Sequence, residues 1–261
     1  MTSLNWSPDG TRLATGCYDG VARIWSEHGV VEHELHEHTG PVFSIKWSKD
    51  GKYLLSGSYD RRSIVWDAST GAVSQIFTVH AAPVLDVDWK DSNTFATSSS
   101  DRKIHVCELK STAGVLTDPT KAVCTFEGHT DEVNCITWSP GGDFLASCSD
   151  DSTAKIWTVA DGLKFDLKGH TKEIYTVRWT PTGPGSSHPD TPLRLCSASF
   201  DGTVKIWNVD DGSIVLNLSR HGQPVYSLAT NPMGTILAAG SLGGYVTLWS
   251  LEDGSMVCFY K

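Results

Sequence analysis

Short apolar runs alternate with polar residues along the whole chain, and glycine, proline or aspartate interrupts them at regular intervals. The pattern is fullest between Glu127 and Trp157. This segment contains an alternating run that ends near Trp138, a Ser-Pro-Gly-Gly turn, an apolar run that begins at Phe144 and a last alternating run. Alternation with a period of two and turn residues between short runs is typical of strands and not of helices. The segment therefore predicts strands joined by tight turns.

The same pattern recurs along the chain, and four kinds of residue keep fixed places in it. The closing position of each copy is Trp25, Trp66, Cys107, Trp157, Trp207 and Trp249. An opening histidine stands at His38, His80, His129, His170 and His221. An aspartate six residues before the closing position is Asp19, Asp60, Asp101, Asp151 and Asp201, and a hydroxyl four residues earlier is Thr15, Ser56, Thr97, Ser147 and Ser197. In the last copy Gly243 and Ala239 replace both, so we expect the hydroxyl and the carboxylate to touch.

A repeat of about 40 to 45 residues with four short strands and a Gly-His…Trp-Asp signature resembles the WD40 repeat. The resemblance extends over essentially all 261 residues. It implies an all-β fold, a β-propeller with six four-stranded antiparallel blades in this chain. We expect a single WD40 domain, 1–261, with blades near 1–37, 38–79, 80–128, 129–169, 170–220 and 221–261.

In WD40 proteins the four recurring groups form one hydrogen-bond relay, from tryptophan to serine or threonine, to histidine, to aspartate. Leaving such a group buried and unpaired would cost about 1–3 kcal/mol, which favours this reading. The resemblance implies complete relays in copies two, four and five: His38, Ser56, Asp60 and Trp66; His129, Ser147, Asp151 and Trp157; His170, Ser197, Asp201 and Trp207. Copy three has Cys107 in place of tryptophan. Copy six lacks the middle pair, so its relay is expected to be absent.

Several stretches resemble one subfamily, the transducin beta-like 1 corepressor proteins. The most specific are Lys-Glu-Ile-Tyr-Thr at 172–176, Pro-Thr-Gly-Pro-Gly at 181–185, and Ile-His-Val-Cys at 104–107. This resemblance implies an eight-bladed propeller that follows a LisH dimerisation motif and works in nuclear corepressor–histone deacetylase complexes, where it contacts histones. The chain contains no LisH or F-box-like region, so we expect six blades of the larger ring and leave ring closure and the oligomeric state open.

Charge and cysteine content narrow the classes of partner. The formal net charge is −9, from 21 basic and 30 acidic residues, which argues against a nucleic-acid partner held through its phosphates. An acidic surface suits basic peptides or proteins, although ordinary solubility explains it equally well. Apolar runs are too short for a membrane span, and no secretory signal is evident. Seven cysteines without a C-x-x-C pair indicate buried thiols in a reducing compartment, the nucleus or the cytoplasm.

Neither a catalytic site nor a cofactor site is expected. Serine, histidine and aspartate recur together in most copies, and a nucleophile would not be copied into every blade. His28, His33, His36 and His38 invite a metal hypothesis, but they are expected along one outer strand and its loop, and a structural zinc site needs four convergent ligands. The sequence therefore predicts no enzyme, no metal and no cofactor.

The predicted upper end of the blades is the candidate binding surface. The residue before each turn aspartate and the residue four before each strand-a tryptophan slot are expected near the channel rim, where WD40 propellers commonly bind peptides. With neighbouring carboxylates, the candidate set is Tyr18, Phe43, Tyr59, Leu85, Ser100, Glu132, Asn134, Asp150, Glu173, Tyr175, Phe200 and Tyr226. Aromatic rings among carboxylates suit a peptide that contains lysine or arginine. Alternatively, some of these rings pack against neighbouring blades.

Two polar insertions, 110–121 and 181–194, are expected at the opposite, lower end, where they form either a second contact surface or loops without a function.

The function expected first is that of a scaffold subunit of a nuclear corepressor–histone deacetylase complex that binds histone-tail-like peptides and partner proteins. The alternative is a substrate-recognition adaptor of a ubiquitin ligase or a cytoplasmic signalling scaffold.

Overall fold

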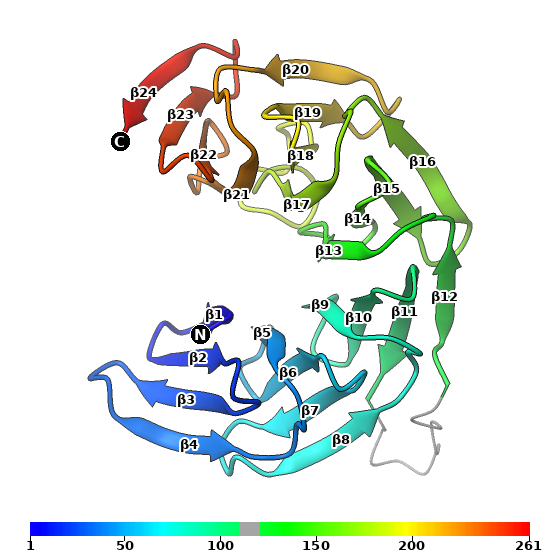
Figure 1. Cartoon of the computed structure of the whole chain (residues 1–261), viewed down its shortest axis with the longest axis vertical. Helices are drawn as coiled ribbons and strands as arrows, with labels where there is room; N and C mark the ends of the chain where they lie inside the picture. The colour runs from blue at the N-terminus through cyan, green and yellow to red at the C-terminus, as the bar shows by residue number, and fades with distance from the viewer. Residues whose placement is uncertain (110–120) are drawn as a thin grey trace. The chain divides into compact units, whose positions relative to one another are not determined.

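The computed structural model describes residues 1–109 and 121–261, and it divides into two compact units, Met1–Gly128 and His129–Lys261. In the described residues of each unit, three four-stranded antiparallel sheets are present, which we call blades one to six in chain order (Figure 1). The strands of the first unit are β1 (Ser3–Trp6), β2 (Arg12–Gly16), β3 (Ala22–Ser26), β4 (Val31–Leu35), β5 (Val42–Trp47), β6 (Tyr53–Ser58), β7 (Ser63–Asp67), β8 (Val73–Phe77), β9 (Val84–Trp89), β10 (Thr94–Ser99), β11 (Lys103–Glu108) and β12 (Cys124–Glu127).

The second unit repeats this arrangement in blades four to six. Its strands are β13 (Val133–Trp138), β14 (Leu145–Ser149), β15 (Thr153–Thr158), β16 (Gly162–Lys168), β17 (Ile174–Trp179), β18 (Arg194–Ser199), β19 (Val204–Asn208), β20 (Ile214–Leu218), β21 (Val225–Thr230), β22 (Ile236–Ser241), β23 (Val246–Ser250) and β24 (Met256–Tyr260). The prediction of an all-β fold with six four-stranded antiparallel blades is thus confirmed for the described residues. No helix among them is long and apolar enough to span a membrane.

Each blade runs through its four strands in sequence order, so strands that are consecutive in the sequence pair antiparallel within the sheet. Strand a forms one edge of each sheet and strand d forms the opposite edge, as Figure 1 shows for β5 and β8. We call the end of a blade that carries the loop into strand a and the b–c turn its upper end. The a–b and c–d turns lie at the lower end.

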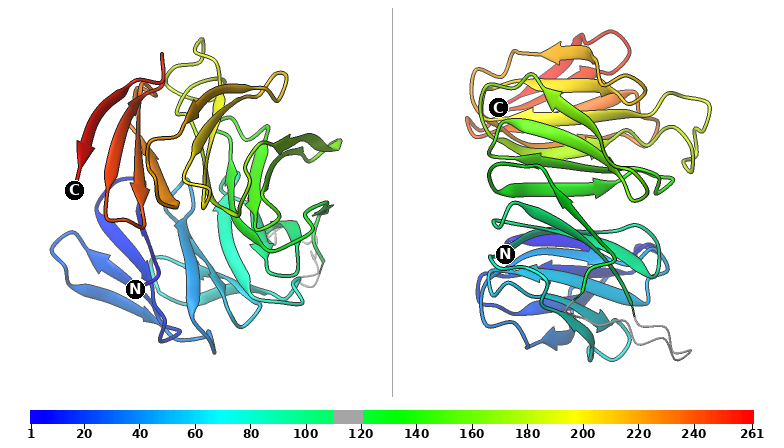
Figure 2. Two further views of the ribbon diagram at one scale, coloured as in Figure 1. Left: turned by 45° about the horizontal axis from the view of Figure 1, so that its top comes forward. Right: turned by 90° about the vertical axis from the view of Figure 1, so that its right-hand side faces the viewer.

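The core of each unit lies between neighbouring blades, which stack face to face (Figure 2). One buried cluster joins blades one and two and another joins blades two and three, and blades four, five and six are joined likewise. The indole of Trp47 donates to the carbonyl of Asn5 in the preceding blade, at 3.1 Å. Trp89 and Trp179 make the equivalent bonds, at 3.1 and 2.9 Å. These three strand-a tryptophans therefore fasten blades two, three and five to the blade before each.

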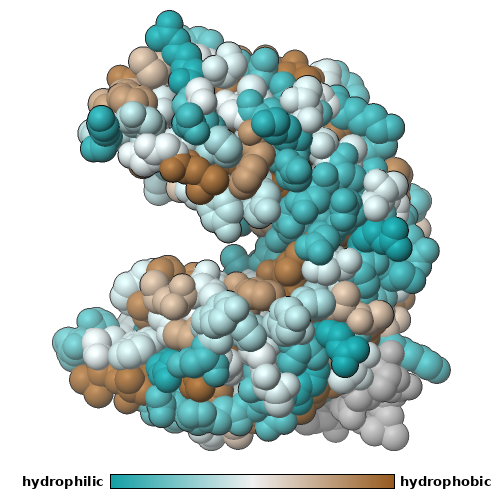
Figure 3. Space-filling view, in the orientation of Figure 1, coloured by the Kyte–Doolittle hydropathy of each residue, from teal (hydrophilic) through white to brown (hydrophobic). Residues whose placement is uncertain are grey.

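The surface of both units mixes hydrophilic residues with small hydrophobic patches, as Figure 3 shows for one face. The insertion between β17 and β18 is ordered by its own hydrogen bonds. The hydroxyl of Thr182 donates to the carbonyl of Pro192 at 2.9 Å, and the N–H of Gly183 donates to the carbonyl of His188 at 3.0 Å. The insertion contacts the a–b turn of blade four through Gly185. It therefore lies at the lower end of its unit, where strand order places it.

Three expectations are left as predictions. The insertion predicted at 110–121 falls almost wholly outside the described residues. The assignment of 1–261 to a single domain and the closure of a ring are likewise not decided by two units that are each described by themselves.

Candidate functional site

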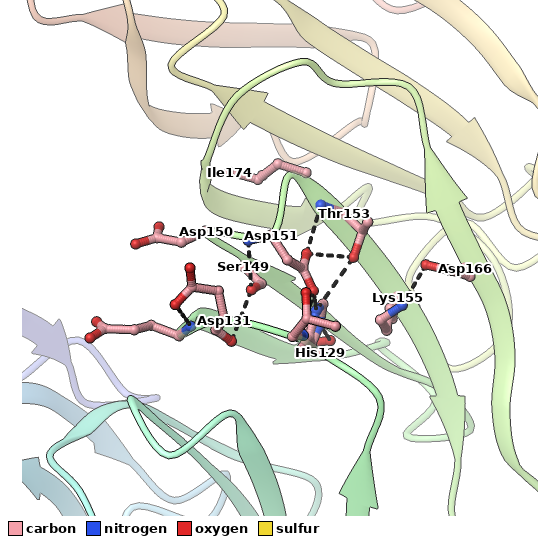
Figure 4. A network of polar contacts seen from close by, with 12 residues as sticks. His129, Asp131, Ser149, Asp150, Asp151, Thr153, Lys155, Asp166 and Ile174 are labelled. Carbon is pink, nitrogen blue, oxygen red and sulfur yellow. Dashed lines mark hydrogen bonds and ion pairs between the residues drawn. The ribbon is translucent and has the colours of Figure 1, made fainter.

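The predicted relay groups are joined by hydrogen bonds in blade four, and Figure 4 shows His129 and Asp151 among them. His129 Nδ1 lies 2.8 Å from Asp151 Oδ2, and His129 Nε2 lies 2.8 Å from Ser147 Oγ. The indole of Trp157 donates to the same hydroxyl oxygen at 2.8 Å. The hydroxyl and the carboxylate, which we expected to touch, are joined through the imidazole instead. Their joint loss in blade six is explained because both serve one histidine.

Blades two and five contain the same chain of contacts. His38 lies 2.9 Å from Asp60 and 2.8 Å from Ser56, which accepts from Trp66 at 2.8 Å. The corresponding distances in blade five are all 2.8 Å, for His170 with Asp201 and Ser197 and for Trp207 with Ser197.

Blade six lacks the hydroxyl and the carboxylate, as the sequence indicates. Its tryptophan, Trp249, contacts His221 directly, with Nε1 and Nε2 3.3 Å apart. This direct contact was not expected from the sequence. It arises because Ala239 presents no hydroxyl between the indole and the imidazole.

The relay aspartate also closes the b–c turn, which fixes the upper end of the blade. Asp151 Oδ1 accepts from the backbone N–H of Thr153 at 2.8 Å, while Oδ2 accepts from the N–H of Thr130 at 3.0 Å. Burial alone would raise the pKa of Asp151, but the hydrogen bond and charge of His129 hold that pKa well below the usual range of a carboxyl. The ionised carboxylate thus joins the loop into strand a to the b–c turn.

These two connected segments carry the two predicted series of binding residues. In blade five the N–H of Phe200, in the b–c turn, donates to the carbonyl of Glu173, in the loop before β17, at 2.9 Å. In blade four Asp150 bonds Glu132 in the same way, at 3.1 Å. The structure therefore brings the series together at the upper end of each of these blades, above the relay.

A β-bulge at the start of strand a is a feature that sequence reasoning missed. The pairing of β17 with β18 skips from Ile174 to Thr176, which leaves Tyr175 unpaired. The equivalent skipped residues in blades two, three, four and six are Phe43, Leu85, Asn134 and Tyr226. A bulge redirects the side chain of the extra residue. Their spacing located all five in the sequence, the resemblance to WD40 repeats suggested that they bind peptides, and the bulge is the physical reason why they share one position.

The upper ends of the first unit expose two tyrosines. The exposed fractions of Tyr18 and Tyr59 are 74% and 59%. Phe43 is partly buried and meets Tyr59 edge to face, with ring centroids 6.3 Å apart. A pocket of about 530 Å³ lies beside Tyr59 and is lined by Thr39, Gly40, Asp60, Arg61, Ala81, Ala82 and Pro83. Leu85 and Ser100 are partly buried.

The upper ends of the second unit carry what we call the aromatic row, formed by Phe200, Tyr175 and Tyr226. The ring of Tyr175 stacks on Phe200 with centroids 4.6 Å apart, and it lies 5.3 Å from Tyr226. Tyr226 is 51% exposed, whereas Tyr175 and Phe200 are partly buried. The sequence left open that some of these rings pack against other residues and do not face a ligand. Tyr175 and Phe200 do pack against each other, so this holds in part for these two rings.

Three carboxylates, Glu132, Asp150 and Glu173, accompany the row, and we call them the acidic group. The amide of Asn134 donates to Asp150 Oδ1 at 2.6 Å and to the carbonyl of Ile174 at 3.0 Å. In Figure 4 Asp150 points away from the relay, unlike Asp151. Burial raises the pKa of Tyr175, and the negative charges of Asp150, Glu173 and Glu132 raise it further. The row therefore lies in a negative field.

The sequence did not indicate the cluster of His80, Asp101 and His105 in blade three. Their potential ligand atoms lie within 4.8 Å of one another. Both nitrogens of His80 are engaged, with Asp101 at 2.9 Å and Thr97 at 2.8 Å, and His105 bonds Thr125 at 2.9 Å. Burial lowers the pKa of His105 to about 4. The cluster is thus the relay of blade three with a second imidazole beside it.

The four histidines that suggested a metal site from the sequence do not share such a cluster. His28 and His36 are largely exposed and lie near glutamates, with His28 3.7 Å from Glu27 and His36 3.4 Å from Glu34. His38 belongs to the relay of blade two. Within the described residues, the donor atoms of these histidines do not form a group of three.

Comparison with known families matches this chain to "WD domain, G-beta repeat" over residues 1–26, 29–67, 71–108, 120–158, 162–208 and 212–250. The chain belongs to the WD40 repeat family. Its fold is also that of a solved WD40 domain, the C-terminal WD40 domain of Sif2, with a TM-score of 0.84 over 99% of this chain and 70% of the other, at 24% sequence identity.

Two curated WD40 relatives are much more similar in sequence. The WD40 repeat-containing protein HOS15 of Arabidopsis thaliana is 50% identical over 91% of this chain and 38% of its own length. The F-box-like/WD repeat-containing protein TBL1X of Mus musculus is 49% identical over 90% of this chain and 43% of its own length. The resemblance to transducin beta-like 1 proteins is therefore confirmed for the WD40 repeats, and the chain spans less than half the length of these relatives.

Proposed function

We propose that this WD40 chain is a non-enzymatic scaffold that binds basic, histone-tail-like peptides at the upper ends of its blades. We place it in a nuclear transcriptional corepressor–histone deacetylase complex. The observation that carries the binding chemistry is the aromatic row beside the acidic group in the second unit. The sequence similarity to TBL1X and HOS15 supports the setting.

The chemistry of the site favours a cationic peptide over other ligands. A positive side chain gains from the face of an aromatic ring and from nearby carboxylates together. Asp150 is held in place by Asn134, so it need not be ordered when a ligand arrives. The formal net charge of −9 adds a long-range attraction for a basic partner.

The pocket beside Tyr59 extends the proposed surface to the first unit. Its volume of about 530 Å³ is sufficient for a side chain of a bound peptide. Tyr59 is 59% exposed at this pocket, so its ring is available to a partner. We treat Tyr59 and the aromatic row as separate contact points, one in each unit.

Alanine substitution of the aromatic contacts tests this proposal. Tyr59→Ala, Tyr175→Ala and Phe200→Ala are each expected to weaken the binding of a basic histone-tail peptide about tenfold, because each removes a ring that contributes about 1–2 kcal/mol. Isothermal titration calorimetry at physiological salt measures the loss, and thermal unfolding monitors the fold.

Trp6→Ala is the matched control, because Trp6 is a 52% exposed aromatic residue at the lower end of blade one. It is expected to leave the affinity unchanged. Unaltered peptide affinity in all three upper-end variants would show that the peptide, if it binds, is held elsewhere.

A further inference from the structure

The geometry of the aromatic row restricts which cation it accepts. The ring planes of Tyr175 and Phe200 differ by 26°, and those of Tyr175 and Tyr226 differ by 36°. Tyr175 is therefore stacked on Phe200, while its ring is tilted relative to that of Tyr226. Tyr175 contacts both other rings, so Phe200 and Tyr226 lie at the two ends of the row, and Tyr226, with 51% of its surface exposed, is the more accessible end.

A methylated ammonium group requires a different arrangement. Such a group is nearly spherical, and aromatic cages bind it with several ring faces directed at one point. The faces of Tyr175 and Phe200 are stacked on each other with ring centroids 4.6 Å apart, so these two rings leave no space between them for a sphere. A guanidinium is planar and stacks on a single ring face while its N–H groups remain free to donate sideways.

The acidic group supplies acceptors for those N–H groups. Asp150 lies in the b–c turn of blade four, and Glu173 precedes the strand that carries Tyr175. The amide of Asn134 joins Asp150 to the carbonyl of Ile174, next to Tyr175, and the carbonyl of Glu173 accepts from the N–H of Phe200 at 2.9 Å. A carboxylate accepts two parallel N–H bonds from a guanidinium but only a point contact from an ammonium.

We propose that the upper end of the second unit is an arginine-recognition site, an inference that rests on the proposed function. The guanidinium stacks on the aromatic row and donates to the acidic group. Unmodified arginine is preferred to lysine and to trimethyllysine in the same peptide. Methylation of the arginine weakens binding, because it preserves the charge but blocks paired donation to a carboxylate.

A set of peptides that differ at one residue tests this preference. One short basic peptide is prepared with arginine, lysine, trimethyllysine or citrulline at its centre, and each is titrated into the full chain by calorimetry. We expect arginine to bind about tenfold more tightly than the other three. Citrulline keeps the planar shape without the charge, so it separates stacking from electrostatics.

The outcomes distinguish this inference from the proposed function. Equal binding of the arginine and lysine peptides, or tighter binding of trimethyllysine, overturns the arginine preference and leaves basic-peptide binding intact. Failure of every peptide to bind overturns the proposed function and this inference with it.

Two variants locate the preference on the structure. Asp150→Asn and Tyr226→Leu are each expected to abolish most of the advantage of arginine over lysine. Asp253→Asn, which removes one charge from the lower end of blade six, is the matched control and should preserve it. An arginine advantage that survives both test variants would overturn the assignment to the aromatic row.

Discussion

Replacement of His129 by alanine is expected to lower the free energy of unfolding of the second unit by about 3 kcal/mol. The imidazole lies 2.8 Å from both Asp151 and Ser147, and its side chain is almost fully buried. Its removal leaves a buried carboxylate and hydroxyl without their shared partner and opens a cavity. Urea unfolding followed by tryptophan fluorescence measures the change as a shift in the midpoint at a constant slope.

His221→Ala is the control for this prediction, because blade six has the same histidine without the relay. His221 bonds Trp249 at 3.3 Å, and neither a relay hydroxyl nor a relay carboxylate stands in its blade. We expect a smaller loss there, because both variants open a cavity but His221→Ala breaks only one hydrogen bond and strands no buried carboxylate. Similar losses in the two variants would mean that the relay adds nothing beyond ordinary packing of a histidine.

The second large effect is expected at Gly185, in the insertion between β17 and β18. Gly185 has a φ of +80°, and a Cβ added there would lie 2.4 Å from the Cα of Gly141 and 2.7 Å from its nitrogen. Both neighbours are backbone atoms in the a–b turn of blade four, so neither can move without distorting that turn. Gly185→Ala is therefore expected to detach the insertion locally, at a cost of about 2–3 kcal/mol. Hydrogen exchange of residues 181–193 reports the detachment.

Gly162→Ala is the control that measures the cost of backbone strain at a positive φ without the steric clash expected at Gly185. Gly162 also has a φ of +80°, but a Cβ there would meet no atom within 4 Å. We expect it to cost about 1 kcal/mol and to leave exchange in the insertion unchanged. If Gly185→Ala behaves like Gly162→Ala, the insertion is not held by its contact with blade four.

The repeat pattern was sufficient to predict the strands, because each blade reuses one set of physical constraints. The fixed distance from the turn aspartate to Trp66 or Trp157 predicts the position of strand c, and the hydroxyl four residues before the aspartate predicts that of strand b. The alternation of apolar and polar residues predicts which face of each strand is buried. The relay contacts followed from the resemblance to WD40 repeats, whereas the joint loss of hydroxyl and carboxylate at Ala239 and Gly243 suggested a direct contact that the imidazole in fact mediates. The spacing of residues within each repeat was therefore sufficient to predict most of the strands.

The upper-end site was only partly predictable, for reasons of geometry. The spacing predicted that Tyr175 and Phe200 lie near each other. Their stacking, however, depends on a β-bulge, which no type of residue in the sequence predicts. Similarly, His105 looked like an ordinary strand residue, and only the fold brings its ring centroid within 4.5 Å of that of His80. Contacts between neighbouring strands and turns depend on register, which a single sequence specifies weakly.

The most direct measurement of the central claim is affinity purification of the endogenous protein from nuclear and from cytosolic extracts, with the co-purifying chains identified by mass spectrometry. Our account predicts that a histone deacetylase and a corepressor subunit are recovered from the nuclear extract, and that Phe200→Ala in a tagged copy reduces the recovery of histones. Recovery of only ubiquitin-ligase or signalling subunits, from either extract, would contradict it and would favour a WD40 adaptor in another setting.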